Sequence, residues 1–360
     1  MSVMSFVQRG TRLLAAGAVA AIVLVGGSAP GVALGARSDA GAASPLAAKP
    51  LAWTQQTVTT TPELRHDAGM AFDRLHQNTV LFGGTNDLTI LPRTTWIWNG
   101  STWSGLTTAF TPFALSAAAM DWDGINGKVM MFAGNAPPCN PICTDYNTTF
   151  EFDGTNWAQL HPATQPVPRA GGRIVYDSLH KQVVLFGGAD QNGGFLSDTW
   201  VWDGVNWTQK FPATVPPGRY YPQMAYDPGH QQVVLFSGLT WNNFMLTDTW
   251  TWDGTNWTQQ NPTTLPAGRY DASMTYDVAL KAVVLFAGNT VQRSDLTLND
   301  TWAWTGSNWK QLTVQGTLPT ARWRQGMAFD ALHNNLVVFG GKTGSTAIGI
   351  LLGDTWTLHQ

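Results

Sequence analysis

One sequence pattern occurs six times along the chain, and it constrains the fold more than any other feature. Each unit has an aromatic residue followed by Asp, an apolar run that ends in small residues, a pair of aromatics two apart and a turn segment of the type Asp-Gly-x-Asn-Trp. The marker Asp recurs at steps of 50, 54, 50, 50 and 53 residues. A near-constant period of this length is typical of solenoids and propellers. The marker residues are Asp73, Asp123, Asp177, Asp227, Asp277 and Asp330.

Each unit is expected to form four short strands. In the third unit, the Val-Val-Leu-Phe run at 183–186 is too short for a helix and apolar throughout, which indicates a strand buried on both faces. Trp200 and Trp202 share one face of the next strand, and Asp203-Gly204 predicts a hairpin turn because Gly tolerates positive φ. Sheets that are covered on both faces by similar sheets have to stack around an axis. The sequence therefore predicts an all-β protein, a six-bladed β-propeller of four-stranded blades.

The two ends of the repeat region predict how the ring closes. The last unit stops after the segment 355–358 and lacks a fourth strand, whereas Trp53-Thr54-Gln55 matches Trp207-Thr208-Gln209 of the third unit. An N-terminal strand is therefore expected to complete the last blade, which removes the exposed sheet edges of an open ring. The propeller is predicted to span residues 51–360.

The residues ahead of the propeller have the features of an export signal. Arg9 and Arg12 flank the start of an apolar stretch at 13–25, and small residues follow at 33–36, so residues 1–36 are predicted as a signal peptide and 37–50 as a linker. The alternative is an uncleaved membrane anchor, which the short apolar run disfavours because spanning takes about 20 apolar residues. We expect an exported protein, secreted or held at the cell surface or in the periplasm, with no membrane span in its mature form.

The chain has two cysteines, Cys139 and Cys143, in one loop of the second unit. In an oxidising compartment they are expected to form a small local disulfide, whereas in a cytosol they would be bystanders. The stabilisation is expected to be small, because a short loop removes little chain entropy.

The Gly187-Gly188 doublet after an apolar strand, followed by spaced aromatics at about 50 residues per unit, resembles the kelch-repeat family, in a bacterial-type exported form. The resemblance covers residues 51–360 and implies the propeller fold. It leaves the function open, because kelch propellers include scaffolds, sugar-active enzymes and peptide-binding domains. This chain departs from the pattern at four places, which are Ala133-Gly134, Phe150-x-Phe152, Ser237-Gly238 and Ala287-Gly288.

The repeat also separates structural residues from candidates for function, because a residue type that recurs at one position of the units is expected to be structural. Four histidines follow the marker Asp by three residues and are assigned to turns: His76, His180, His230 and His333. A Pro-x-x-Arg pattern leads into the first strand, and its arginines are expected to pair with the Asp of Asp-Thr-Trp in the same unit. The functional alternative is a basic ring that holds carboxylate or phosphate groups. The expected pairs are Arg169–Asp198, Arg219–Asp248, Arg269–Asp300 and Arg322–Asp354.

Residues outside the repeat pattern gather in two kinds of connection, the loop from second to third strand and the segment leading into the first strand. In an up-and-down blade both connections emerge on one rim, where loop-borne sites are expected. Arg65 belongs with these candidates because its unit has Thr94 at the Asp position. The predicted ligand-binding residues are Arg65, Tyr220, Tyr221, Trp241, Asn242, Phe244, Tyr270, Trp323 and Arg324.

The composition and motifs favour a binding module over an enzyme. Net charge is −3 and no cluster of Lys and Arg is visible, so nucleic acid is not an expected partner. The galactose oxidase-like propellers that the resemblance brings to mind use a copper site with a Cys-linked Tyr, which this chain does not supply convincingly; no metal site, cofactor or catalytic residue is assigned. The alternative is a carbohydrate-active enzyme, a glycosidase, lyase or oxidase-like propeller, that uses carboxylates on the same rim, such as Asp67, Asp271 and Asp295. The ligand of a binding module is a glycan or a protein, and a surface scaffold is the third possibility.

Overall fold

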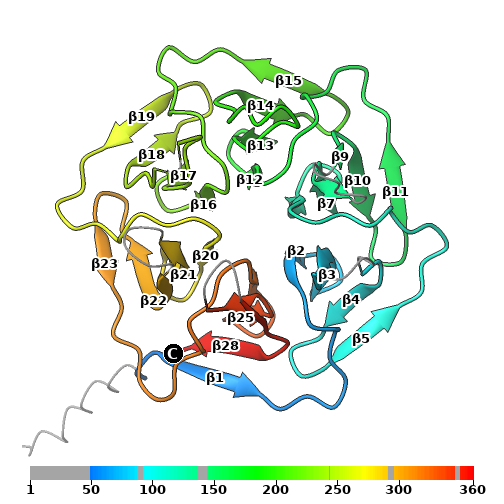
Figure 1. Cartoon of the computed structure of the whole chain (residues 1–360), viewed down its shortest axis with the longest axis vertical. Coiled ribbons are helices and arrows are strands. Elements are labelled where there is room, and N and C mark those ends of the chain that lie inside the picture. The colour runs from blue at the N-terminus through cyan, green and yellow to red at the C-terminus, as the bar shows by residue number, and fades with distance from the viewer. Residues whose placement is uncertain (1–48, 88–91, 137–143, 243, 291–295, 345–348) are drawn as a thin grey trace, which may run out of the picture. The chain divides into compact units, whose positions relative to one another are not determined.

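The computed structural model describes residues 49–87, 92–136, 144–242, 244–290, 296–344 and 349–360. The segment from Ala48 to Gln360 forms one unit, in which six four-stranded sheets surround a central axis (Figure 1). None of the described residues lies in a helix. The prediction of an all-β, six-bladed propeller is confirmed.

The first three blades are each built from strands in chain order, from the axis outward. Blade 1 has β2 (His66–Asp73), β3 (Asn78–Thr85), β4 (Thr95–Trp98) and β5 (Trp103–Leu106). Blade 2 has β6 (Ala119–Asp123), β7 (Lys128–Phe132), β10 (Thr149–Phe152) and β11 (Trp157–Leu160). Blade 3 has β12 (Arg173–Asp177), β13 (Gln182–Phe186), β14 (Thr199–Trp202) and β15 (Trp207–Lys210).

The last three blades follow the same order, except that the outer strand of blade 6 comes from the start of the chain. Blade 4 has β16 (Gln223–Asp227), β17 (Gln232–Phe236), β18 (Thr249–Trp252) and β19 (Trp257–Gln260). Blade 5 has β20 (Ser273–Asp277), β21 (Ala282–Thr290), β22 (Leu296–Trp304) and β23 (Trp309–Gln311). Blade 6 has β24 (Gly326–Asp330), β25 (Asn335–Phe339), β28 (Thr355–His359) and β1 (Ala52–Gln56). Two short hairpins extend the loops of blades 2 and 6, namely β8 (Asn135–Ala136) with β9 (Thr144–Asp145), and β26 (Lys342–Thr343) with β27 (Ile350–Leu351).

The core lies between the blades rather than at the centre of the ring. In β13, the residues from Val183 to Phe186 are completely buried, because each blade is covered on both faces by its neighbours. Across the Asp-Gly turn of the same blade, Trp202 pairs with Trp207, and their ring centroids are 5.6 Å apart. The repeating apolar run and the Trp pairs are thus what holds adjacent blades together.

The ring closes through the first strand of the chain. β1 pairs antiparallel with β28, with Trp53 opposite Leu358 and Gln55 opposite Trp356. Trp53 is buried and packs on Phe286 of blade 5, with ring centroids 4.6 Å apart. The predicted closing strand is confirmed.

The marker Asp and the His after it build the turn between the first two strands. In blade 3, Asp177 Oδ1 accepts from the backbone N of Leu179 and His180, and Asp177 Oδ2 lies 2.7 Å from His180 Nδ1. The His180 ring also covers Gly254 of blade 4, where a Cβ would lie 2.4 Å from His180 Cε1. The prediction of a turn role is confirmed for all four histidines. The corresponding contacts are His76–Asp73, His230–Asp227 and His333–Asp330.

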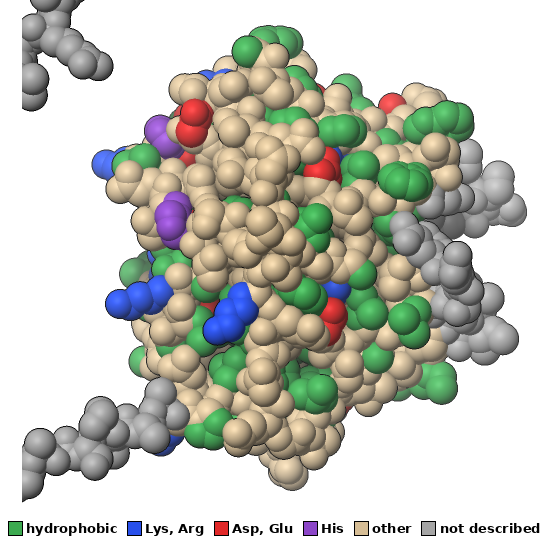
Figure 2. All heavy atoms as spheres, turned by 90° about the vertical axis from the view of Figure 1, so that its left-hand side faces the viewer, with side chains coloured by type: hydrophobic (Ala, Val, Ile, Leu, Met, Phe, Trp, Pro, Cys, Tyr) green, Lys and Arg blue, Asp and Glu red, His purple; other side chains and the backbone are tan. Residues whose placement is uncertain are grey.

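The turns between the first two strands, together with the Asp-Gly turns, form one end of the ring, which we call the turn rim. Figure 2 shows the ring from the side, with His side chains along one edge of it. Over the rest of this face, Lys, Arg, Asp and Glu side chains are scattered singly among uncharged ones.

Candidate functional site

The loops between the second and third strands and the segments that lead into the inner strands meet at the other end of the ring, which we call the loop rim. The two kinds of segment touch directly, because Tyr220 pairs with Leu239 and Tyr270 with Asn289 through isolated antiparallel bridges. All of the residues that were predicted as ligand contacts lie in these segments. These side chains differ widely in how exposed they are and in the protein groups that they contact.

Four arginines of the Pro-x-x-Arg pattern are held in buried ion pairs. Arg219 donates from Nη1 and Nη2 to the two carboxylate oxygens of Asp248 at 2.8 and 2.9 Å, and from Nη1 to Ser237 O at 3.0 Å. These bonds use the N–H donors with which the guanidinium would otherwise bind a ligand anion. The predicted structural role is confirmed in blades 3 to 6. The same bidentate contact joins Arg169 to Asp198, Arg269 to Asp300 and Arg322 to Asp354.

The aspartates of these pairs also accept a hydrogen bond from a tryptophan. Asp300 Oδ2 also accepts from Trp302 Nε1 at 2.7 Å. Burial acts to raise the pKa of Asp300, but the hydrogen bonds and charge of Arg269 outweigh it and hold the pKa below its usual value. The carboxylate is therefore ionised in the folded protein at neutral pH.

Arg65 has no such aspartate, and its partner is Glu63. The Arg65 guanidinium is 1% exposed, forms an ion pair with Glu63 and donates to Gly83 O at 3.1 Å. Burial lowers the pKa of Arg65, and the Glu63 charge opposes that shift. The side chain proposed for ligand contact thus faces protein groups.

A chain of backbone hydrogen bonds runs around the channel mouth, and the sequence did not reveal it. The residue two positions after each Pro-x-x-Arg arginine, or its equivalent, has a left-handed φ, between 49° at Tyr221 and 64° at Gly171. Five of these residues are not Gly, so the conformation is strained and needs support from the surroundings. Backbone hydrogen bonds link successive members in every case except Tyr221 and Asp271, for example Ala117 N to Asp67 O at 3.1 Å and Arg324 N to Asp271 O at 2.8 Å. The six residues are Asp67, Ala117, Gly171, Tyr221, Asp271 and Arg324.

Arg324 closes part of this mouth by joining two aspartates from different blades. Its Nε donates to Asp271 Oδ2 at 2.8 Å, and its Nη1 lies 3.2 Å from Asp67 Oδ2. Its guanidinium carbon also lies 4.6 Å from the Trp323 ring centroid and 5.3 Å from that of Tyr221. Arg324 was predicted to be free for a ligand, whereas these partners hold it in an ion-paired and cation–π setting.

The two aspartates respond differently to the same arginine. Burial acts to raise the pKa of Asp67, but Arg324 and His66 outweigh it and lower the pKa. For Asp271, burial outweighs the charge of Arg324 and, together with the charge of Asp67, raises the pKa to about 6. Among the described residues, Asp271 Oδ1 has no hydrogen-bond partner. Neither carboxylate is open to the solvent of the rim, since both are buried or nearly so.

Three of the predicted aromatic residues pack beneath the loops instead of projecting from them. Tyr221, Tyr270 and Trp323 are 3%, 7% and 2% exposed. Tyr220 is half-buried and lies against Tyr221, with ring centroids 4.1 Å apart. Burial raises the pKa of Tyr220 to about 12. These rings form a floor for the loop rim and have little open face on which a ligand could stack.

Trp241 and Phe244 are the aromatic residues that project, and they flank a groove between the loops of blades 3 and 4. They are 79% and 58% exposed. Their loop is held by its own bonds, since Phe244 N donates to Thr240 Oγ1 at 3.1 Å and Thr240 N donates to Phe244 O at 2.9 Å. The groove, which we call the loop groove, has a volume of about 650 Å³.

The opposite wall of the loop groove is a loop of blade 3 that Asp190 holds in shape. Asp190 Oδ1 accepts from Asn192 N and Gly194 N, both at 2.9 Å. Asn242 and Asn192 are exposed amides on the two walls. All ten residues that line the groove are uncharged, namely Asn192, Gly193, Gly194, Phe195, Pro217, Gly218, Thr240, Trp241, Asn242 and Phe244.

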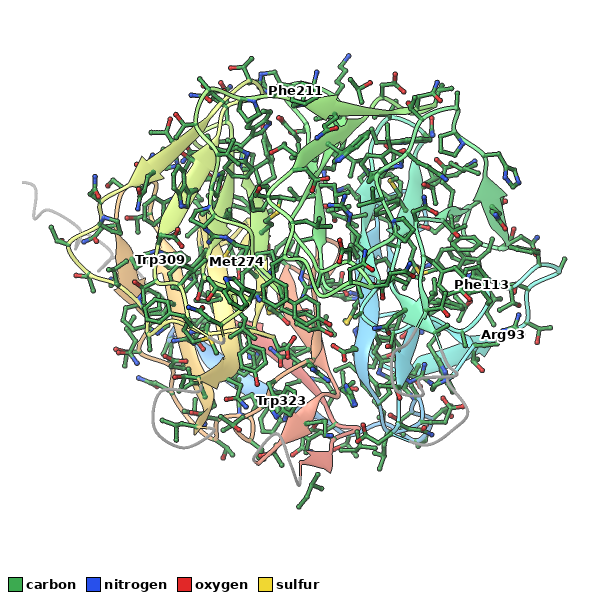
Figure 3. The ribbon with its side chains drawn as sticks, turned by 45° about the horizontal axis from the view of Figure 1, so that its top comes forward. Arg93, Phe113, Phe211, Met274, Trp309 and Trp323 are labelled. Atoms are coloured by element: carbon green, nitrogen blue, oxygen red, sulfur yellow. The ribbon has the colours of Figure 1, made fainter. Side chains whose placement is uncertain are left out.

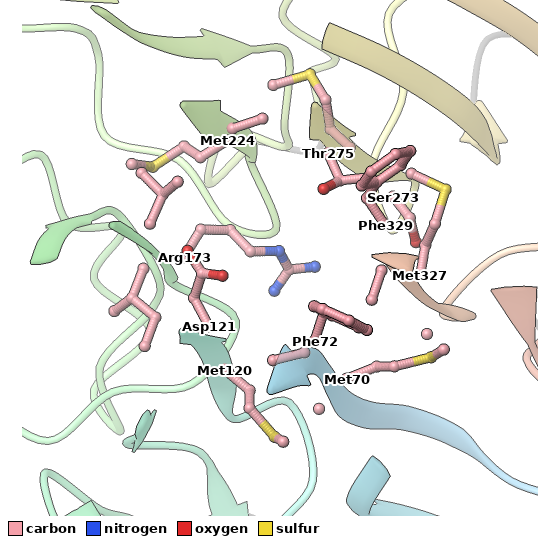
Figure 4. A pocket seen from close by; sticks show the side chains of 18 of the residues that line it. Met70, Phe72, Met120, Asp121, Arg173, Met224, Ser273, Thr275, Met327 and Phe329 are labelled. Carbon is pink, nitrogen blue, oxygen red and sulfur yellow. The ribbon is translucent and has the colours of Figure 1, made fainter. Parts of the chain in front are cut away.

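The central channel contains a second cavity, of about 470 Å³, lined by the six inner strands. Its wall is rich in Met and aromatic side chains, and Figure 4 shows Met70, Phe72, Met120, Met224, Met327 and Phe329 around it. Five charged side chains line this cavity. Asp67 and Arg324 belong to the mouth described above, Arg74 follows the marker Asp of blade 1, and Arg173 and Asp121 come from the inner strands of neighbouring blades. Neither Arg173 nor Asp121 was singled out from the sequence, although each breaks the repeat at its position.

Some predictions fall on residues that are not described. Cys139 and Cys143, Asp295 and the segment 1–36 lie outside the described residues, so the disulfide, one candidate carboxylate and the signal peptide stay predictions. Over the described part of the chain, no three His, Cys, Asp or Glu side chains gather as metal ligands would. In the same part, no helix is long and apolar enough to cross a membrane.

Comparison with known proteins bears on the fold and the family. Residues 116–341 match the family model described as the KLHDC2/KLHL20/DRC7 Kelch-repeats domain. No curated protein matches the chain. Among solved structures, one described as "Structure of YjhT" is similar with a TM-score of 0.63 and 15% identity, over 84% of this chain and 99% of that one. Because the family model matches well over half of the chain and the six blades agree with it, the protein belongs to the kelch-repeat β-propeller family.

Proposed function

We propose that this protein is an exported binding module and that its loop groove holds a neutral glycan. Kelch propellers are generally interaction modules, and binding needs only a rim with aromatic and hydrogen-bonding groups. The chemistry of the groove supports this assignment more than that of the other rim positions, where the candidate side chains are buried or ion-paired.

The single observation that carries the proposal is the exposure of Trp241, 79%, on a loop that its own hydrogen bonds hold in place. An indole with an open face offers a flat apolar platform, and leaving it in water is unfavourable unless something covers it. A sugar ring has an apolar C–H face that fits such a platform, while its hydroxyls suit the amides of Asn192 and Asn242. Since the lining is uncharged, we assign a neutral glycan rather than an acidic one.

A protein ligand is the other class that the groove suits, because exposed aromatics also anchor peptides. The alternative of a carbohydrate-active enzyme draws less support from the rim carboxylates, since Asp67 and Asp271 share Arg324. Analysis of bound glycans for cleavage products, run alongside the binding measurement, tests that alternative.

The binding test uses the chain without residues 1–36 on arrays of neutral glycans, acidic glycans and peptides. We expect binding to neutral glycans, weakened about tenfold or more by Trp241→Ala, as loss of a stacking anchor does. Phe211→Ala is the matched control, because Phe211 is an equally exposed ring, 84%, at the outer edge of the ring of blades (Figure 3). Binding that survives Trp241→Ala, or binding confined to peptides, would contradict the proposal.

Export is tested separately. We expect the protein recovered from outside the cytoplasm to begin near residue 37 by N-terminal sequencing. Recovery from the cytoplasm alone, with the first 36 residues intact, would contradict the export assignment.

A further inference from the structure

Among the charged side chains that line the channel cavity, Arg173 in β12 and Asp121 in β6 carry opposite charges that the repeat does not explain. Arg173 is the fourth residue before its marker Asp, a position occupied in the other blades by Gly69, Ala119, Gln223, Ser273 and Gly326. Asp121 is the second residue before its marker, where the other blades have Ala71, Val175, Ala225, Thr275 and Ala328. A charge at one position of a sixfold pattern is not needed to build a blade, so both side chains are free to serve another purpose.

Arg173 is held by one hydrogen bond to a backbone carbonyl and one cation–π contact. Its Nη1 donates to Gly172 O at 3.1 Å, and its guanidinium carbon lies 5.6 Å from the Tyr221 ring centroid. Among the described residues, no carboxylate lies within the 4.0 Å of an ion pair. Figure 4 shows the guanidinium extending into the cavity, so most of its five N–H donors point at the space rather than at the wall.

Asp121 is the complementary case. Its Oδ2 accepts from Tyr176 N at 2.8 Å, which ties the carboxylate to the neighbouring blade. Burial raises the pKa of Asp121, and the charge of Arg74 opposes that shift from beyond ion-pair distance. Asp121 and Arg173 both line the cavity (Figure 4), and within the described residues neither group has an ion-pair partner, not even the other.

Two unpaired opposite charges on one cavity wall match a ligand that carries both charges itself. A simple anion in the cavity would be repelled by the carboxylate of Asp121, and a simple cation would be repelled by Arg173. A zwitterion can place each of its charges on the opposite charge of the wall. Between these two groups the wall carries several Met side chains, which fill irregular shapes. Of the other charged lining residues, Asp67 and Arg324 are paired with each other at the mouth, and Arg74 lies beyond the marker Asp of blade 1. We propose that the channel binds a free α-amino acid with an apolar side chain, its carboxylate on Arg173, its ammonium on Asp121 and its side chain among the methionines. The volume of about 470 Å³ lies within the range of small-molecule sites.

The site is separate from the loop groove, and its test does not depend on the glycan. The chain without residues 1–36 is titrated calorimetrically with each of the twenty L-amino acids, and thermal shift is measured in parallel. We expect Met, Leu or Phe to bind, and N-acetylation or amidation of the same amino acid to weaken binding about tenfold or more, the size of a lost charge-assisted bond. Trp241→Ala should leave amino-acid binding unchanged, so failure of one proposal is distinguishable from failure of the other.

Two variants assign the ends of the ligand. In Asp121→Asn, N-acetylation of the amino acid should no longer weaken binding, whereas amidation of its carboxylate still should. In Arg173→Gln, amidation should no longer weaken binding, whereas N-acetylation still should. These comparisons are made within one variant, so a general loss of stability does not mimic them, and Arg173→Lys and Asp121→Glu replace any variant that fails to fold. Arg93→Gln, on the outer edge of the ring (Figure 3), is the charge-matched control. If no amino acid binds, or if blocked and free forms bind equally to the unaltered chain, the proposal is wrong.

Discussion

Trp53 donates from Nε1 to Thr301 Oγ1 at 3.4 Å, although the two residues are 248 positions apart. The same Trp-to-Thr hydrogen bond links each of the remaining five pairs of adjacent blades, as with Trp257 to Thr199 at 2.9 Å. Trp53 therefore completes a cycle of six identical contacts and makes the start of the chain part of the last blade. The remaining links are Trp103–Thr355, Trp157–Thr95, Trp207–Thr149 and Trp309–Thr249.

Removal of residues 51–57 should expose the edge of β28 and leave Phe286 without its cover. We expect a protein that aggregates or melts much lower, because an open edge strand invites pairing and a buried indole is lost. A chain that begins at Lys49 is the control. Equal melting temperatures for the two chains would refute the closing role of β1.

The ion pair of blade 4 should behave as a unit. Asp248→Thr leaves Arg219 buried and without its carboxylate, which we expect to lower the free energy of unfolding by about 3–5 kcal/mol. The double variant Arg219→Leu/Asp248→Thr reproduces blade 2, where Leu115 and Thr148 stand at these positions, and should cost less than Asp248→Thr alone. Chemical denaturation of the unaltered chain, both single variants and the double variant decides it, and additive losses would show that the pair is not coupled.

Stability should depend on pH through Asp271, whose pKa of about 6 in the folded protein lies above the ordinary value of 3.8. As pH rises from about 4 to about 6 the unfolded chain loses this proton first, so this group makes the folded state progressively less stable, and the loss is complete above the folded pKa. Asp67, Asp300 and Asp354 act in the opposite sense, because their lowered pKa values give stability that is lost as pH falls.

Asp271→Asn isolates the first of these contributions, since Asn keeps an oxygen for Arg324 but does not titrate. We expect the unfolding free energy of Asp271→Asn, relative to the unaltered chain, to increase between pH 4 and pH 6 and then to level off. Asp203→Asn, at an exposed turn, is the control. A difference that does not change with pH would contradict the raised pKa.

Substitution of the two tryptophans outside the repeat, Trp323 and Trp241, should affect the free energy of unfolding to different extents. Trp323→Ala removes a buried ring that touches Arg324, Lys342 and Tyr270, and should lower the free energy of unfolding by about 3–5 kcal/mol. Trp241→Ala should change it by no more than about 0.5 kcal/mol, because the ring is exposed. Similar losses in the two variants, measured by denaturation, would show that exposure does not separate the two positions.

The sequence by itself determined the number of blades, the order of their strands and the way the ring closes. Blades 1 to 5 are made of neighbouring hairpins, so the contacts that define them are local and repeat every 50 residues or so. The closing strand of blade 6 was recognised because its sequence matches the outer strands of the other units. The same repetition identified the pairing of Arg219 with Asp248, because the blades that carry one partner also carry the other, and assigned His180 to its turn. Pattern is sufficient where partners lie within one unit.

Tertiary structure alone decided which candidates on the loop rim face solvent. Trp241 and Trp323 look alike in the sequence, both outside the pattern and both in rim segments, yet one projects from a loop and the other lies beneath Lys342 and Arg324. Arg324 likewise looked free until Asp67 and Asp271, from blades 1 and 5, were seen to meet it. Exposure depends on what the surrounding segments place around a residue. For Arg324 those partners are Asp271, 53 positions away, and Asp67 in blade 1, so no local periodicity reports them.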